Sequence, residues 1–341
     1  MNGEGGLAPR RILVINVSRI GDTLLVTPAL RALAARWPGA SIDFLGHPKR
    51  YEIIRHLPFI AAAAPISKQR ALFKGWLPGK RWDLAFVYGF DRALVSYALR
   101  VARRVVAFRQ TDGELNARLE RCVERPAFQS VHAVDFSLAL TRALGIADAG
   151  RRLSYTVTPE ERAWAKETLA LKGAAGKHPL VGLQMASFPT KAFRDWPSEH
   201  FASLARRVLA AWPQAHFLLF GGKADAGRTL EFAARFPGRS ASLAGEISLR
   251  GSAALMNELD LYVGVDTGPT HIMGALEPPM IALYHSHSPS FLLEPLERAG
   301  CQVIDHPRAG RDNSPQAPMA EISVDAVWAK VEQALAARRF G

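Results

Sequence analysis

Short apolar runs alternate with amphipathic stretches along this chain, and the alternation occurs twice. The first series of strand-length runs lies at 11–16, 41–45, 60–66, 83–88 and 104–108. The second series lies at 180–184, 216–220, 260–265, 280–284 and 302–304. Apolar runs of this length, separated by stretches with helical periodicity, favour parallel strands covered by helices. The sequence therefore predicts two α/β units.

A break in the pattern suggests where one unit ends. A charged helix is expected at 159–171, and the residues after it, 172–179, are rich in glycine and alanine and end in proline. We expect a first domain at 1–170, a second at 171–322 and a C-terminal helix at 323–341, for which packing on the first domain is one expectation. Parallel sheets bind ligands beyond the carboxyl ends of their strands, which predicts a central cleft between the two domains.

The first segment with functional side chains follows the first strand and reads N-V-S-R-I-G-D-T. Gly21 suits a tight turn with a close backbone approach. Asp22 falls at a helix start, where its carboxylate either caps free N–H groups or acts as a general base. We place Ser18, Arg19 and Gly21 on the acceptor side. The segment lacks the G-x-G-x-x-G pattern of a dinucleotide site.

The second segment, D-L-Y-V-G-V-D-T-G-P-T-H, is a strand that runs into a turn at Asp266. Proline is favoured in a first helical turn, so a helix is expected to open at Pro269. Thr267 and Gly268 would then present N–H groups at a helix N-terminus, which suits a diphosphate. His271 could face the same ligand. The alternative is an ordinary capped turn.

The third segment places two hydroxyls and two cations in one loop after the strand at 180–184: Ser187, Thr190, Lys191 and Arg194. Such groups could neutralise a leaving phosphate, although a solvated charged loop is the alternative. Weaker signals for nucleotide contacts come from Gly222, Lys223 and Glu246. A metal site at His285 and His287 is not expected, because no nearby cysteine or carboxylate completes it.

The positive charge of the chain lies in its first part. The net charge is +12, and residues 1–150 hold 22 Lys and Arg against 12 Asp and Glu. A basic surface attracts anionic partners such as nucleic acid or an anionic lipid surface, or it simply aids solubility. No nucleic-acid-binding motif accompanies the charge, so we expect no nucleic acid. No run of 18–20 apolar residues and no signal core are found, which predicts a cytoplasmic chain. Cys122 and Cys301 are expected to be unpaired thiols.

At these segments the chain resembles the lipopolysaccharide heptosyltransferases, glycosyltransferase family 9. Three blocks carry the resemblance: 12–33 with Gly21-Asp22, 191–201, and 243–289 with the D-T-G-P-T-H turn. The resemblance implies a GT-B-like fold of two Rossmann-like α/β/α domains. It also implies a role for each matching residue. Asp22 would be the catalytic aspartate; Thr267, Gly268 and His271 the diphosphate-binding turn; Asp266 a contact to the donor sugar. Either Arg194, at the family's lysine position, or Lys191 would bind the phosphates.

The activity implied is an inverting, metal-independent transfer of heptose from ADP-heptose to an anionic lipopolysaccharide core acceptor. Neither a cofactor nor a metal is expected, and the protein would contact the inner face of the cytoplasmic membrane. One alternative is a family 9 transferase with another nucleotide sugar or a non-lipid acceptor. Others are a nucleotide-sugar epimerase of similar fold and a non-catalytic nucleotide-binding module.

Overall fold

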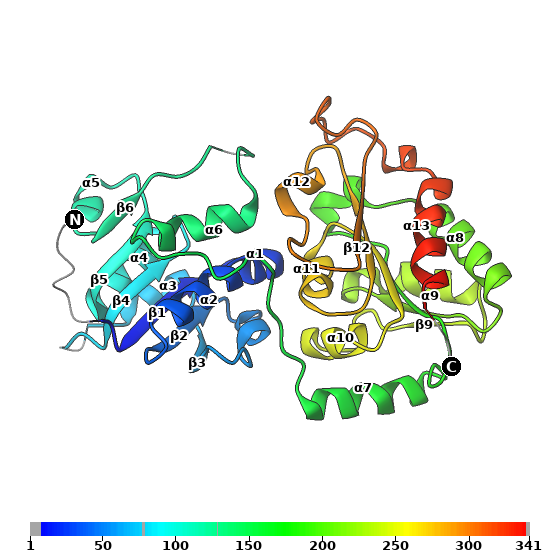
Figure 1. Ribbon diagram of the computed structural model, residues 1–341, viewed down its shortest axis with the longest axis horizontal. Helices are drawn as coiled ribbons and strands as arrows, with labels where there is room; N and C mark the ends of the chain where they lie inside the picture. The colour runs from blue at the N-terminus through cyan, green and yellow to red at the C-terminus, as the bar shows by residue number, and fades with distance from the viewer. Residues whose placement is uncertain (1–7, 77–78, 128, 339–341) are drawn as a thin grey trace. The chain divides into compact units, whose positions relative to one another are not determined.

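The chain forms two compact units, residues 1–156 and 157–341, each built on one parallel sheet (Figure 1). The structure is a computed structural model that describes residues 8–76, 79–127 and 129–338. The two-unit α/β architecture predicted from the sequence is confirmed.

The first unit holds six parallel strands in the order β3-β2-β1-β4-β5-β6. The strands are β1 (Arg11–Asn16), β2 (Ser41–Gly46), β3 (Ala62–Pro65), β4 (Trp82–Val87), β5 (Ala102–Phe108) and β6 (Arg121–Val123). The helices are α1 (Ile20–Leu25), α2 (Thr27–Arg36), α3 (Lys68–Phe73), α4 (Arg92–Val101), α5 (Gly113–Ala117) and α6 (Ala133–Arg142), with a 3-10 turn η1 (Tyr51–Ile54). Leu13 and Ile15 of β1 pack with α4, and the alternate residues Ile12 and Val14 are equally buried, so both faces of the sheet are covered.

The second unit repeats this topology with the order β12-β11-β10-β7-β8-β9. Its strands are β7 (Leu180–Gln184), β8 (His216–Phe220), β9 (Ser240–Ser242), β10 (Leu261–Val265), β11 (Met280–Tyr284) and β12 (Cys301–Asp305). Its helices are α7 (Pro159–Leu171), α8 (Ser198–Ala211), α9 (Ala226–Ala234), α10 (Leu249–Met256), α11 (Gly268–Ala275), α12 (Ser290–Leu293) and α13 (Val324–Ala336), with 3-10 turns η2 (Pro189–Arg194), η3 (Lys223–Asp225) and η4 (Met319–Glu321). In both sheets the strand order reverses beside the first strand, which is where open α/β sheets bind ligands.

The ends of the second unit differ from the prediction. The chain divides after Thr156 and not after residue 170, because α7 packs against α10 and Glu161 forms an ion pair with Arg250. The glycine-rich residues 172–179 are therefore a turn inside the second unit. The C-terminal helix α13 buries Val327 and Val331 in the second unit's core beside α8, so it belongs to the second unit and is not a separate segment.

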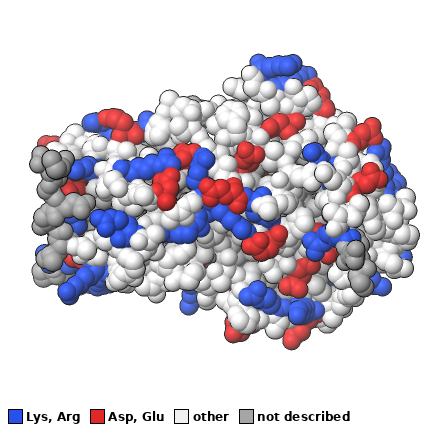
Figure 2. All heavy atoms as spheres, viewed as in Figure 1, with Lys and Arg blue, Asp and Glu red and all other residues white. Residues whose placement is uncertain are grey.

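Basic side chains gather on the first unit. Figure 2 shows a band of lysine and arginine over the face of that unit in view, interrupted by a few acidic residues. Within the described ranges, none of the helices is both long enough and apolar enough to cross a membrane.

His216, at the start of β8, makes stability sensitive to acid. Its side chain is buried, neither ring nitrogen has a hydrogen-bond partner within the described residues, and burial, followed by Lys177 and Arg239, lowers its pKa. Unfolded histidine binds a proton near pH 6.5, whereas folded His216 resists it, so the free energy of unfolding decreases as the pH falls below about 6.5. Urea unfolding between pH 5 and pH 8 should show this decrease, with a smaller slope in His216→Phe. The exposed His56→Gln control should keep the wild-type slope; a His216→Phe slope equal to wild type would contradict the assignment.

Candidate functional site

Three loops meet at the carboxyl-end edge of the second sheet, because β10 pairs with both β7 and β11. They bring together Arg194, Asp266 and Ser288. Arg194 donates from Nη1 to Asp266 Oδ2 at 2.7 Å and from Nη2 to Ser288 Oγ at 2.6 Å. The Asp266 side chain is only 3% exposed, and the buried Arg194 Nε has no hydrogen-bond partner within the described residues. A buried, geometrically fixed ion pair therefore stands at the predicted donor turn.

The N-terminus of α11 is open to an anion. Thr267 is the N-cap residue, its side chain makes no capping hydrogen bond, and Pro269 has no N–H to offer. The Thr270 hydroxyl turns inward to Val265 O, 2.5 Å away, and to the Tyr262 hydroxyl at 2.9 Å. The N–H groups of Gly268 and Thr270 have no partner among the described residues. The helix therefore begins at Gly268, one residue earlier than predicted, and its first turn offers N–H groups and a positive dipole end to a phosphate.

His271 also reaches this turn. Its buried imidazole lies with Nε2 3.5 Å from Asp266 Oδ1, on the oxygen opposite the one that Arg194 contacts. Asp266 is thus flanked by two basic groups. A carboxylate held in this way has a fixed orientation, which suits recognition of sugar hydroxyls.

Hydrogen bonds within the loop after β7 fix its conformation. The N–H and the hydroxyl of Ser187 both donate to Asp195 Oδ1 at 2.7 Å, and the hydroxyl also lies 2.6 Å from Lys191 O. Asp195 is itself paired with Arg228 at 2.7 Å. Ser187, which the sequence placed on the donor, is therefore engaged within the loop. Trp196, the next residue, is buried and donates to Ile322 O at 2.8 Å, and α8 follows directly, as predicted.

Lys191 and Thr190 are the groups of this loop that stay available. Thr190 is exposed, and Lys191 is half-buried with Nζ 5.6 Å from the centroid of the Phe193 ring. Neither side chain has an ion-pair or hydrogen-bond partner in the part of the chain that the structure describes. Both cations of this loop are candidates to bind the phosphates. Arg194 forms an ion pair with Asp266, whereas Lys191 has no ion-pair partner among the described residues.

The weaker nucleotide candidates lie at the ends of β8 and β9, on the same edge of the sheet. Gly222 donates its N–H to Asp225 Oδ2 at 2.8 Å, and Glu246 forms an ion pair with Lys172 at 2.6 Å. A Cβ at Gly245 would come within 2.9 Å of the Lys223 Cα, so the two loops pack closely. The Lys223 side chain itself is exposed.

His285 and His287 form hydrogen bonds that fix the loop after β11 against residues 313–317. His285 Nδ1 accepts the His287 N–H at 2.9 Å, which leaves the proton on Nε2 to be donated to Ala317 O at 2.8 Å. His285 is fully buried, and burial lowers its pKa. His287 Nδ1 lies 2.8 Å from Asn313 O. No group of three or more metal-ligating side chains is found among the described residues.

In the first unit, Asp22 lies beyond the carboxyl end of β1. The strand order of this sheet reverses between β1 and its neighbour β4. It is the third residue of α1, its side chain is exposed, and Oδ2 lies 3.4 Å from the Arg19 N–H. That contact is too long for a strong cap, so the carboxylate remains accessible. Gly21 is buried in the first turn of α1 and not in a separate turn ahead of the helix.

The surroundings of Asp22 are ordered. Asn16, buried at the end of β1, donates to Asp22 O at 3.0 Å. Arg50 donates to Ser18 O at 3.0 Å, and the Ser18 hydroxyl lies 3.4 Å from that of Thr23. Arg19 is exposed beside them. Asn16 and Arg50 were not predicted, because both act through backbone carbonyls that the sequence does not show.

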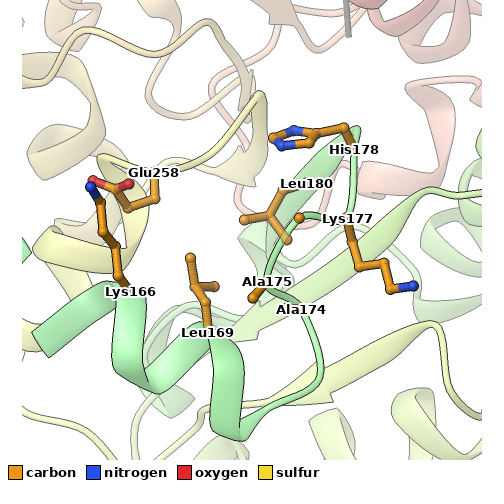
Figure 3. A pocket seen from close by; sticks show the side chains of 9 residues that line it. Lys166, Leu169, Ala174, Ala175, Lys177, His178, Leu180 and Glu258 are labelled. Carbon is orange, nitrogen blue, oxygen red and sulfur yellow. The ribbon is translucent and has the colours of Figure 1, made fainter. Parts of the chain in front are cut away.

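A hollow of about 200 Å³ lies at the opposite, amino-end edge of the second sheet (Figure 3). In Figure 3 the side chains of Leu169 and Leu180 point into it, and those of Lys166 and Glu258 stand at one side. His178, at its rim, is held by Asp260 with 2.6 Å between Nδ1 and Oδ2. This hollow is separate from the loops around Asp266, since it lies at the other end of β7.

Known proteins share both this sequence pattern and this fold. The model for glycosyltransferase family 9 (heptosyltransferase) matches residues 90–319. Lipopolysaccharide heptosyltransferase 2 of Salmonella typhimurium is 27% identical over 306 residues, which cover 82% of this chain and 84% of that protein. Among solved structures, a family 9 glycosyltransferase from Veillonella parvula has a TM-score of 0.82 at 20% identity and covers 96% of this chain and 98% of its own. ADP-heptose lipopolysaccharide heptosyltransferase II of Escherichia coli has a TM-score of 0.78 at 22% identity, with coverage of 96% and 98%.

Proposed function

Since the chain belongs to glycosyltransferase family 9, we propose that it transfers heptose from ADP-heptose to a lipopolysaccharide core acceptor, with inversion at the anomeric carbon and without a metal. The observation that carries the proposal is the buried Arg194–Asp266 pair beside the uncapped N-terminus of α11. The named substrates of the relatives from Salmonella typhimurium and Escherichia coli support the choice of donor and acceptor.

The second unit would bind the donor. The diphosphate would accept hydrogen bonds from the N–H groups of Gly268 and Thr270, with Lys191 and Arg194 as the counter-charges. Asp266, held by Arg194 and His271, would receive hydroxyls of the donor sugar. Gly222 and Lys223, at the end of the next strand, would flank the nucleoside.

The first unit would supply the base. Asp22 takes the proton of the acceptor hydroxyl as the hydroxyl oxygen forms its bond to the anomeric carbon. The bond from that carbon to the phosphate oxygen breaks, and ADP leaves with the electron pair. Because the nucleophile enters on the face opposite to the leaving ADP, the configuration inverts. General-base assistance of this kind contributes roughly 10²–10⁴-fold to the rate.

Fixed cations would take the place of a metal in this site. Lys191, Arg194 and the helix N-terminus present positive charge without the need for an ion. We therefore expect the transfer rate to be unchanged in excess EDTA, measured by ADP release with donor and acceptor both present. A loss of rate that Mg²⁺ or Mn²⁺ restores would contradict metal independence.

Transfer itself tests the proposal. The purified protein would be incubated with ADP-heptose or with other nucleotide sugars, in the presence and absence of core oligosaccharide freed of its acyl chains. We expect one heptose to be added to the oligosaccharide by mass spectrometry, with inverted anomeric configuration by NMR. Conversion of the nucleotide sugar without acceptor would instead favour an epimerase, and transfer from another donor would overturn the heptose assignment.

A further inference from the structure

Three large apolar side chains project from one short helix of the first unit and the turn behind it. Leu72, Phe73 and Trp76 are 53%, 82% and 70% exposed. Within α3 itself only Ala71 is buried. A surface helix normally turns its large apolar residues toward the core, and a group of exposed ones at adjacent positions marks an interaction surface. We call this group the aromatic tip.

The turn that carries the aromatic tip is built to hold this shape. Gly75 has φ +81°, and a Cβ at this position would lie 2.7 Å from Val101 Cγ1. Arg100 of α4 donates from Nε and Nη2 to Lys74 O at 3.1 and 3.0 Å, and its guanidinium lies 4.4 Å from the centre of the Trp76 ring. The exposed aromatic ring is thus presented by the fold.

The polar group of Trp76 is satisfied from within the chain. Its indole N–H donates to Leu72 O at 2.9 Å. An indole whose N–H is already paired can enter an apolar medium without leaving an unmade hydrogen bond. This favours insertion into hydrocarbon or a lipid headgroup boundary.

The charge around the aromatic tip fits an anionic partner. Residues 53–82 contain six Lys and Arg and no Asp or Glu. Arg70 and Lys74 are exposed beside Phe73, while Lys68 is paired with Asp91 at 2.8 Å. Cationic side chains next to exposed aromatic and aliphatic ones are the composition that binds anionic lipid surfaces. We infer that the aromatic tip is a membrane-docking element that places the first unit on an anionic phospholipid bilayer.

This inference rests on the proposed function, because a lipid-linked acceptor is reached at a bilayer, but the two fail separately. The site residues Asp22, Lys191 and Arg194 are not part of the aromatic tip. A protein with a disrupted tip should therefore still transfer sugar to a soluble core oligosaccharide at the wild-type rate. Its transfer to acceptor embedded in vesicles should fall.

The test is co-sedimentation of the full chain with vesicles of phosphatidylglycerol and phosphatidylethanolamine, compared with phosphatidylcholine vesicles. We expect binding to the anionic vesicles that weakens with salt. The double variant F73S/W76S should lose this binding, and R70Q/K74Q should bind roughly 30-fold more weakly, since each basic residue near the surface contributes about fivefold. A matched control, L171S/L230S, removes two residues that are 87% and 57% exposed in the second unit and should bind like wild type.

A second readout assigns the contact to Trp76. Brominated lipid quenches tryptophan fluorescence on contact, and Trp76→Phe keeps an aromatic ring while removing one of the chain's seven tryptophans. Quenching should be smaller in this variant although its vesicle binding is retained. The inference is overturned if F73S/W76S binds vesicles like wild type, if neutral vesicles bind equally well, or if a nucleic acid competitor is bound in preference to the vesicles. If vesicle binding holds while the soluble acceptor is not glycosylated by wild type, only the proposed function fails.

Discussion

Replacement of Asp22 by asparagine is expected to slow sugar transfer by about 10²–10⁴-fold, because an amide cannot take the acceptor proton. Donor affinity should stay at its wild-type value, since the residues proposed to hold the donor belong to the second unit. The measurement is steady-state transfer to the core oligosaccharide, with ADP binding followed separately by calorimetry. A matched control is Glu114→Gln, which also neutralises an exposed first-turn carboxylate in the first unit and should leave the rate unchanged.

The same variant distinguishes a role of Asp22 as general base from a role as helix cap. An asparagine at position 22 keeps an oxygen that can accept the Arg19 N–H, which already lies at a long 3.4 Å. The free energy of unfolding should therefore change by less than about 0.5 kcal/mol. If Asp22 served only as a helix cap, Asp22→Asn would transfer sugar nearly as fast as wild type, and that result would contradict its role as base.

The strands could be predicted from the sequence because parallel strands buried on both faces appear as continuous apolar runs. The runs at 180–184, 216–220 and 280–284 coincide with β7, β8 and β11. Shorter or more polar elements gave no such signal. β6 and β9 have only three residues each, and the helical stretch that starts near Asp22 is divided at Val26 into α1 and α2, with Pro28 in the first turn of α2.

Contacts between distant segments could not be predicted. The donor turn was visible as D-T-G-P-T-H, but the Arg194–Asp266 pair joins residues from two loops that meet only because β7 lies next to β10. The domain boundary was misplaced for a related reason: glycine and proline mark both linkers and turns, and only the packing of α7 on α10 distinguishes them. The aromatic tip was hidden because phenylalanine and tryptophan in a sequence usually indicate core.

Arg194 and Lys191 can be separated by their different states. Lys191→Met should weaken donor binding about 10–100-fold, the equivalent of one charged hydrogen bond of about 1.5–3 kcal/mol, and should leave thermal stability unchanged because Lys191 has no ion-pair partner among the described residues. Lys166→Met, which removes an exposed lysine of the second unit at the opposite edge of the sheet, is the control and should leave donor binding unchanged. Wild-type donor affinity in Lys191→Met would contradict the proposed contact.

Arg194→Met should lower both the affinity for the donor and the free energy of unfolding. It leaves the buried carboxylate of Asp266 without the guanidinium that neutralises it, and the removal of one partner from a buried ion pair costs about 3–5 kcal/mol. It also removes one counter-charge of the diphosphate. Adding Asp266→Asn should restore most of the stability, because no unpaired buried charge remains, but should not restore donor binding. Urea unfolding and calorimetry with ADP measure the two effects. Recovery of both properties in the double variant would show that Arg194 only orients Asp266, and the phosphates would then depend on Lys191 and the α11 N-terminus.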